Sequence, residues 1–311
     1  MYRFILVDQL DQELESFIDN SPQKTIYTDP SFLKQLMAFE FRFLVVFKGS
    51  AIKAVSVVFY ENHKIIHGRF PYYSLLLDQN MNDKKNNKKL HILLDEMLIW
   101  IHKNMNDLNY FSLHHSFEDT RAFDWTPYSR VKQEFRSYNR YTSLLDFNEF
   151  SSFEDYLKRL KSARLSDLRK ADSEGYETVF SDNFFELEKL ILNQFEERGE
   201  LIQSHELSLL RDTWASPLLD TNLALTYDSE GELASSSLFA FSGEYAYYIM
   251  GATFSQHRNF GVGTQNLFHQ LRSAFNKKNI VDFLGINSPY RGYYKSSFGG
   301  NLKVNYVLKR E

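Results

Sequence analysis

The chain has 311 residues, of which 43% are hydrophobic and 24% charged, and it carries a formal net charge of −4 and no cysteine. This composition is typical of a globular chain with a full hydrophobic core, and the length favours about two domains. The absence of cysteine excludes disulfide bonds, thiolate metal sites and a cysteine nucleophile. The net charge excludes polyanion binding over the whole surface.

The N-terminal segment carries no recognisable targeting signal. Its apolar run, residues 4–7, is followed by acidic residues and is too short for the core of a signal peptide. No stretch of the sequence approaches the length of a membrane span. We therefore expect a cytoplasmic protein without a membrane span.

The first half is predicted to contain a three-strand antiparallel meander between two helices. Asp29-Pro30 is typical of a helix start. Short turn signals separate β-rich runs at residues 43–47, 51–60 and 64–67, which is the pattern of a meander. Apolar side chains then recur at helical spacing between residues 90 and 101, and a strand is expected to follow.

The second half is predicted to open with a strand at 141–147 and a long basic helix. Ser151-x-x-Glu154 is a capping-box sequence that begins this helix, and Gly175 lies near its end. Its basic residues are Lys158, Arg159, Lys161, Arg164, Arg169 and Lys170. Two interpretations stay open: a solvated basic face near the C-terminal end of the helix dipole, or a groove wall that receives a phosphorylated substrate.

A second meander and a glycine loop follow. Helices are expected from residue 182 and at 206–214, and strands at 223–227, 233–241 and 245–253. The segment Arg258-x-x-Gly261-x-Gly263 then opens another helix. Glycines at such a position allow backbone N–H groups to approach an anion at the helix N-terminus. This indicates a phosphate-bearing ligand, with ordinary turn glycines as the alternative.

The two meanders resemble each other and indicate an internal repeat. Each closes on a glycine, Gly68 and Gly251, which lie 251 − 68 = 183 residues apart. The strands that follow the next helices contain Phe111 and Phe283, which lie 283 − 111 = 172 residues apart. Similar offsets at two places predict two copies of one unit. The first copy continues after Gly68 with Arg69 and has no glycine loop, so only the second copy is expected to hold a cofactor.

The order of meander, glycine loop, helix and strand, followed by Asn287 and Tyr294, resembles the GNAT acyltransferases. Arg258, Gly261 and Gly263 match the loop of that family. Two tandem copies narrow the resemblance to the Fem-like branch, which includes the peptidoglycan interpeptide-bridge aminoacyltransferases and related acyl-CoA enzymes. The basic helix and the segment Lys295-x-x-Phe298-Gly299 also look like that branch.

This resemblance implies an α+β fold of two tandem GNAT-like domains, each a mixed, mostly antiparallel sheet flanked by helices. The expected domains are residues 1–140, without a cofactor loop, and residues 141–311, with one. The resemblance also implies that acyl-CoA is the co-substrate, that Asn287 lies by the CoA arm and that Tyr294 protonates the leaving thiolate. The residues implied to hold the pyrophosphate are Arg258, Asn259, Phe260, Gly261, Val262, Gly263 and Thr264.

Two further residues are candidates for the catalytic site. Asp282 lies in an apolar strand, where a carboxyl group needs a partner, and this favours a structural or substrate-positioning role. Lys295 either binds a phosphate of the donor or of a nucleotide-linked acceptor, or is a solvated lysine. No catalytic base is identified, and Asp282 and His257 are in reach by sequence only. The one adjacent histidine pair, His114 and His115, is expected to face opposite sides of a strand, so no metal motif is predicted.

The leading hypothesis is an N-acyltransferase that moves an acyl group, acetyl in the expected case, from acyl-CoA to an amine acceptor. The acceptor would be an amino sugar, an amino-acid derivative or a nucleotide-linked amine. A second hypothesis keeps the fold but takes an aminoacyl group from tRNA. A third is a catalytically degenerate binding or scaffold protein.

Overall fold

The computed structural model describes residues 1–37, 39–68, 70–82, 84–124, 135–277 and 279–310. Arg69, at the start of the segment that replaces the glycine loop in the first copy, lies outside these residues. The chain forms two compact units, residues 1–140 with 304–311, and residues 141–303. This division differs from the predicted domains, 1–140 and 141–311, after residue 303. Val307 and Leu308 pair with Ser112 and Phe111 of the first unit.

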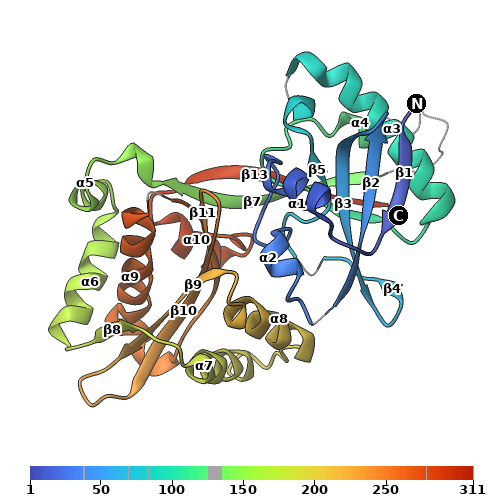
Figure 1. The fold of residues 1–311 in the computed structure, drawn as a ribbon. Coiled ribbons are helices and arrows are strands. Elements are labelled where there is room, and N and C mark those ends of the chain that lie inside the picture. Colours follow the sequence, from blue (N-terminus) through green and yellow to red (C-terminus); the bar gives the residue numbers. More distant parts are fainter. Residues whose placement is uncertain (38, 69, 83, 125–134, 278, 311) are drawn as a thin grey trace. The chain divides into compact units, whose positions relative to one another are not determined.

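The first unit contains an antiparallel sheet with the strand order β1-β2-β3-β4, and β5 also pairs with β3 (Figure 1). Its strands are β1 (Arg3–Val7), β2 (Glu40–Lys48), β3 (Ala51–Glu61), β4 (Lys64–Ile65) and β5 (Leu76–Leu77). The predicted meander is therefore confirmed, with a third strand shorter than expected. Separately, β6 (Tyr110–Ser112) pairs antiparallel with the end of β13 (Asn301–Arg310).

One long helix supplies most of the helical contribution to the core of the first unit. Its helices are α1 (Gln12–Asp19), α2 (Pro30–Leu33), α3 (Asn87–Asn104) and α4 (Arg121–Asp124), with 3₁₀ turns at Gln79–Asn82 and Lys84–Asn86. The apolar stripe of α3, from Leu90 to Ile101, is buried against side chains of β2 and β3 such as Leu44 and Val58. The helical spacing of this stripe in the sequence thus predicted the helix correctly.

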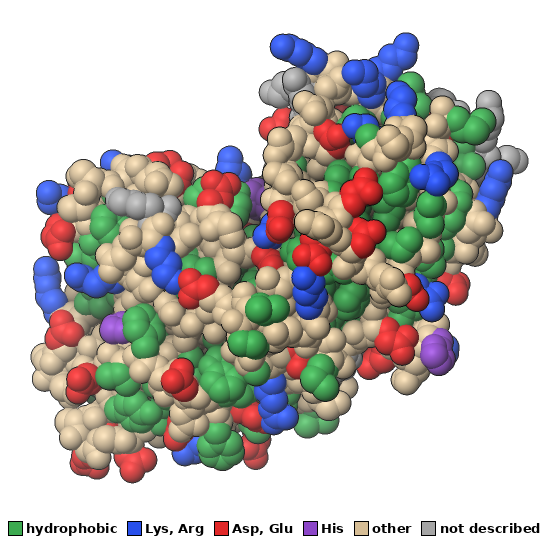
Figure 2. All heavy atoms as spheres, viewed as in Figure 1, with side chains coloured by type: hydrophobic (Ala, Val, Ile, Leu, Met, Phe, Trp, Pro, Cys, Tyr) green, Lys and Arg blue, Asp and Glu red, His purple; other side chains and the backbone are tan. Residues whose placement is uncertain are grey.

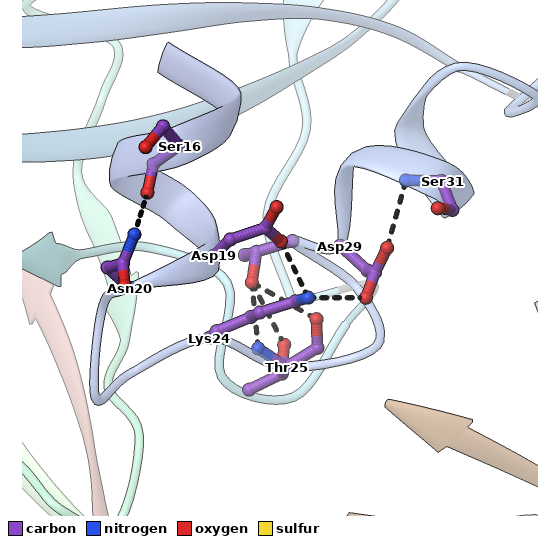
Figure 3. Close-up of polar contacts among 8 residues, drawn as sticks. Ser16, Asp19, Asn20, Lys24, Thr25, Asp29 and Ser31 are labelled. Carbon is purple, nitrogen blue, oxygen red and sulfur yellow. Dashed lines mark hydrogen bonds and ion pairs between the residues drawn. The ribbon is translucent and has the colours of Figure 1, made fainter. Parts of the chain in front are cut away.

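A lysine fixes the connection between α1 and α2. Lys24 contacts Asp19 at 2.7 Å and Asp29 at 2.9 Å (Figure 3). Asp29 also accepts a hydrogen bond from the backbone of Ser31 and so caps α2, as the Asp29-Pro30 sequence predicted. The Lys24 ammonium group therefore links the last residue of α1, Asp19, to the N-cap residue of α2, Asp29.

The second unit is built on a mixed, mostly antiparallel sheet. Its order is β7-β12-β11-β10-β9-β8, and only the β11–β12 pairing is parallel. These strands are β7 (Phe135–Asp146, of which 141–146 belong to this unit), β8 (Glu177–Phe180), β9 (Asp220–Tyr227), β10 (Leu233–Ser242), β11 (Tyr245–Thr253) and β12 (Ile280–Asp282). The second predicted meander, β9 to β11, is confirmed.

Helices cover both faces of this sheet (Figure 1). They are α5 (Phe153–Lys158), α6 (Ser162–Ser173), α7 (Phe184–Glu196), α8 (Ser204–Ala215), α9 (Val262–Asn276) and α10 (Pro289–Ser296), with 3₁₀ turns at Phe147–Glu149 and Ser255–Phe260. Leu238 packs with α7 and α8 on one face, and the next residue, Phe239, packs with α5 and α9 on the other. Both units thus contain a meander, a helix and a strand in the same order, and the predicted α+β fold class is confirmed.

The prediction of one long basic helix from Ser151 onward is wrong, because this segment forms two helices, α5 and α6. Ser152, one residue after the predicted Ser151, caps α5, which ends at Lys158, and Leu160 is buried in the core. Lys161 then takes an extended conformation, with ψ of 137°, and α6 begins. The extended backbone at Lys161 therefore separates α5 from α6, directly after the buried Leu160.

No helix among the described residues combines the length and apolar character needed to cross a membrane. On the face of the molecule in Figure 2, basic and acidic side chains are interspersed.

Candidate functional site

The second unit contains a cavity of about 580 Å³. It is bordered by the edge of β11, the first turn of α9, helices α6 and α10, and the end of α7. The predicted site residues that line it are Arg258, Gly261, Gly263, Thr264, Tyr294 and Lys295. The structure therefore brings together the glycine loop and the Tyr-Lys pair, which lie about 30 residues apart in the chain.

The cavity opens where two parallel strands part. The pairing of β11 with β12 covers only Tyr245–Tyr247 and Ile280–Asp282. Beyond it, β11 continues to Thr253, with a bulge in its pairing with β10 at Ile249. The edge of β11 from Tyr248 to Thr253 consequently faces the cavity and is not covered by β12.

A strained turn directs the chain away from β11. Leu284 and Gly285 both have left-handed conformations, with φ of 44° and 48°. For a leucine this costs on the order of 1–2 kcal/mol. Asp282, which is fully buried, holds the turn by accepting a hydrogen bond from the Leu284 amide (2.9 Å) and another from the Thr142 hydroxyl. Asp282 does not line the cavity, so its contacts are those of a positioning residue.

Lys295 supports the same turn from α10. Its ammonium group donates to the carbonyl oxygens of Phe283 (2.7 Å) and Leu284 (3.0 Å), and it lies 4.4 Å from the ring centroid of Tyr248. Burial and, to a smaller extent, the neighbouring Arg291 charge lower the pKa of Lys295 to about 7, against an opposing effect of Asp282. Lys295 is thus a group in the cavity that exchanges protons near neutral pH.

The glycines of the loop allow two close approaches. Gly261 has a φ of 76°, and a Cβ at this position would lie 2.2 Å from the backbone oxygen of Asp167 in α6. A Cβ on Gly263 would lie 3.0 Å from Thr253 Oγ1 and 3.6 Å from Tyr294 Oη. Only glycine at 261 lets α6 pack directly on the start of α9, and a small residue at 263 leaves room beside the tyrosine hydroxyl.

Ion pairs and hydrogen bonds fix the loop in place. Arg258 pairs with Glu197 at 2.6 Å and donates to the backbone oxygen of Thr253 at 3.2 Å. Lys170 of α6 donates to the backbone oxygen of Asn259 at 2.7 Å and lies over the Phe260 ring. Asn259 and Phe260 contact α6 and do not line the cavity. Val262 is buried in the first turn of α9.

A hydrogen-bonded cluster joins α6 to Tyr294. The Thr264 hydroxyl accepts from Arg164 (3.1 Å) and donates to Asp167 (3.0 Å), while Arg164 and Asp167 form an ion pair. The Arg164 guanidinium lies 5.2 Å from the ring centroid of Tyr294. Burial raises the pKa of Tyr294, and a hydrogen bond with Thr264 and the Arg164 charge act in the opposite direction. Tyr294 is therefore protonated at neutral pH.

Asn287 lies outside the cavity lining. Its side-chain oxygen accepts from the Tyr141 amide at 2.8 Å, and its amide nitrogen donates to the Tyr141 oxygen at 2.9 Å. These two bonds imitate the pairing of two strands and tie the segment before α10 to β7. The predicted role of Asn287 beside a cofactor stays a prediction.

The cavity carries an excess of positive charge. Five basic side chains line it, namely Arg164, Arg198, Arg258, Arg291 and Lys295, against the single acid Asp167. Arg198 and Arg291 were not predicted from the sequence, and Arg164 was predicted only as part of a basic helix. The sequence does contain an indication for Arg291. It precedes Tyr294 by three residues and Lys295 by four, and residues at these spacings are neighbours on one face of a helix. Arg198 left no such signal, since it reaches the cavity from the end of another helix.

No family model matches the sequence, and no curated protein matches it. Similarity appears among solved structures. FemX is 14% identical with a TM-score of 0.61, over 97% of this chain and 96% of FemX. A tandem GNAT protein from the clavulanic acid biosynthesis pathway is 11% identical with a TM-score of 0.58, over 99% of this chain and 98% of that protein. L-PGS from Bacillus licheniformis is 10% identical with a TM-score of 0.55, over 99% and 93%.

These matches span nearly the whole chain, and they confirm the predicted fold. The chain has the tandem GNAT, Fem-like fold, with two GNAT-like units in one polypeptide. At these levels of identity the similarity concerns the fold. The activity depends on the residues of the cavity and not on the fold alone.

We predict that Gly261→Ala lowers the free energy of unfolding by about 2–4 kcal/mol, because the new Cβ meets the Asp167 backbone and the φ is left-handed. The matched control is Gly243→Ala, which has a φ of 57° and no atom within 4 Å of the new Cβ. Its expected cost is about 1 kcal/mol, from the backbone conformation alone. Urea unfolding of both variants is the measurement, and equal costs would contradict the proposed close approach.

We also predict a pH-dependent contribution of Lys295 to stability. From pH 7 up to about 10, the unfolded chain still binds a proton at this lysine that the folded chain has released, so the free energy of unfolding rises with pH. Relative to Lys295→Met, the native protein should gain about 1–2 kcal/mol between pH 7 and pH 9.5, a reduced share because the side chain is partly exposed. Urea unfolding at several pH values measures this difference, and a constant difference would refute the assignment.

Proposed function

We propose that this chain is an N-acyltransferase that moves an acyl group, acetyl in the expected case, from acyl-CoA to the amine of an amino sugar or amino-acid derivative. One observation carries the proposal. The first turn of α9, the protonated Tyr294 and five basic side chains converge on one cavity beside an uncovered strand edge. An acyl donor with phosphate groups matches the charge of that lining.

The start of α9 fits an anionic part of the donor. The first amide groups of a helix have no intrahelical acceptor, and those of Val262 and Gly263 follow directly after the left-handed Gly261. Gly263 keeps the approach to them free of side-chain atoms. We assign the pyrophosphate of acyl-CoA to this turn, with Arg258 at its edge.

The reaction needs groups that stabilise negative charge and supply a proton. The acceptor amine attacks the thioester carbon, the carbonyl oxygen becomes negatively charged, and the C–S bond then breaks. Backbone N–H groups on the edge of β11 between Tyr248 and Thr253 are suited to hold the oxyanion, because β12 does not cover them. Tyr294 lies beside Gly263 in its protonated form, and we assign it as the acid that protonates the leaving thiolate.

The acceptor amine must lose a proton before or during its attack. Lys295 is the group in the cavity whose pKa lies near neutrality, at about 7. A base is most effective when its pKa is close to the working pH. We therefore assign proton acceptance to Lys295, whose charged form is stabilised by two carbonyl oxygens and the Tyr248 ring.

Aminoacyl-tRNA is the alternative donor, and one observation favours it. Asp167 lies 3.0 Å from the Thr264 hydroxyl in the first turn of α9, where a carboxylate already compensates the partial positive charge of the helix. This reduces the attraction of the turn for a pyrophosphate. In the other direction, the basic lining repels the ammonium group of an aminoacyl ester, and this argues for a neutral acyl group.

Calorimetry with acetyl-CoA and with CoA tests the donor. We expect binding by the native protein and loss of binding in Gly263→Trp, whose indole would fill the space beside Thr253 and Tyr294. Filter binding of charged tRNA at several salt concentrations is the parallel measurement, and steep salt dependence there without acetyl-CoA binding would favour the tRNA donor. Binding of neither donor would favour a scaffold protein and sink the proposal.

Tyr294→Phe tests the acid. Loss of a positioned proton donor should lower kcat for thiol release by about 10²- to 10⁴-fold, and the donor KM should change little because the ring remains. Thiol release is measured with acetyl-CoA and a panel of amines. Tyr138→Phe, an exposed tyrosine of the first unit, is the control. An unchanged kcat in Tyr294→Phe would remove this residue from the mechanism.

A further inference from the structure

Helices α6 and α9 also border a second cavity of the second unit, with a volume of about 340 Å³. It extends to α5 and to the start of β8, and we call it the α5–α9 cavity. It shares no lining residue with the candidate functional site, because α6 turns Arg164 and Asp167 to that site but Leu168 and Asp172 to this cavity. Small-molecule sites span about 300–1,000 Å³, so this volume suits a small metabolite rather than a coenzyme.

The α5–α9 cavity has an apolar floor. Phe153 and Phe268 are almost fully buried, and Leu157 and Leu168 pack against the same core while remaining partly exposed. These four side chains come from α5, α6 and α9. An apolar group that covers this floor removes hydrocarbon surface from water on both sides of the contact, which favours binding.

An arginine stands at the cavity without a carboxylate partner. The guanidinium of Arg272 lies 4.6 Å from the ring centroid of Phe153, and it forms no ion pair with any described residue. Stacking on the ring orients the guanidinium and leaves its N–H groups for a ligand. Burial and the Arg272 charge lower the pKa of the nearby His269, so this imidazole is neutral at neutral pH. Arg272 is therefore the cation of the lining.

A carboxylate of the same lining is held in position by a neutral partner. Gln265 donates from Nε2 to Asp172 Oδ1 at 3.2 Å and to the backbone oxygen of Tyr176 at 2.8 Å. Asp172 makes no ion pair within the described part of the chain, and the same holds for Glu177, the other acid of the lining. The Gln265 amide thus fixes the carboxylate without neutralising its charge.

This combination restricts the chemistry of a ligand. An inorganic anion would use Arg272 alone, and an amine would use Asp172 alone. A fatty acid would cover the floor and meet Arg272, but its carboxylate would be repelled by Asp172. A free amino acid with an apolar side chain matches all three features, because it carries a carboxylate, an ammonium group and a hydrocarbon group on one carbon atom.

We propose that the α5–α9 cavity binds a free α-amino acid with an apolar side chain. The ligand carboxylate pairs with Arg272, its ammonium group pairs with Asp172, and its side chain covers the floor of the cavity. The inference is independent of the proposed acyl transfer, since it concerns a different cavity and different residues.

Calorimetry on the full chain with a series of matched ligands tests this site. The first series is L-phenylalanine, phenethylamine, which lacks the carboxylate, and 3-phenylpropionate, which lacks the ammonium group. The second series is L-leucine, 3-methylbutylamine and 4-methylpentanoate, which differ in the same way. In at least one series we expect the amino acid to bind about 10- to 100-fold more tightly than either analogue, because each analogue leaves one charge of the cavity without a partner.

Two variants locate the ligand. Arg272→Gln should weaken the amino acid and the carboxylate analogue by about tenfold or more and leave the amine unchanged. Asp172→Asn should weaken the amino acid and the amine and leave the carboxylate analogue unchanged, while its amide oxygen still accepts from Gln265. Arg169→Gln is the matched control, because Arg169 is exposed on α6 and lines neither cavity. Thermal unfolding checks that all three variants fold.

Two results would overturn the inference. One is the absence of binding by both amino acids at concentrations up to about 10 mM, which is weaker than a specific metabolite site requires. The other is binding of an amino acid that is unchanged in both Arg272→Gln and Asp172→Asn. That result would place the ligand elsewhere, for instance as an acceptor in the candidate functional site, and the proposed function would stand without the second site.

Discussion

The early end of the parallel pairing between β11 and β12 is the constraint on which the site depends. Three pairs of residues hold these strands together, and the chain then turns away at Leu284 and Gly285 in left-handed conformations. Asp282 holds this turn from within the core and Lys295 holds it from α10. Without this divergence β12 would cover the edge of β11, and the cavity would be part of a continuous sheet.

The same turn couples the shape of the site to its electrostatics. The carbonyl oxygens that the turn exposes are the acceptors of Lys295, so a strained backbone positions a basic side chain. Burial of that side chain brings its pKa to about 7. On the opposite side, α6 supplies Arg164 and Asp167 to the start of α9, where Thr264 joins them to Tyr294. Two titratable groups with opposite shifts thus face one cavity, which is the arrangement expected of an acid and a base.

Local sequence patterns predicted the elements that local forces determine. Alternating β-rich runs identified both meanders, and the stripe from Leu90 to Ile101 identified α3. The glycine loop before α9 and the pair Tyr294 and Lys295 are each visible as a short motif. The order of these motifs in the chain was the reason to expect them in one site. The break between α5 and α6 was missed, and it directly follows Leu160, whose burial against distant residues no local pattern shows.

The sequence by itself determined the fold class, the duplicated order of elements and the identity of the loop that approaches Tyr294. Periodicity and turn chemistry are encoded within a few residues, and the resemblance of two segments needs no coordinates. Only the tertiary structure decided that Asn287 binds the backbone of Tyr141 and that Arg198 reaches the cavity from the end of α7. It also decided that Arg164 pairs with Asp167 and Arg258 with Glu197. These outcomes depend on contacts between segments far apart in the chain, and such contacts exist only once the sheet and its helices have packed.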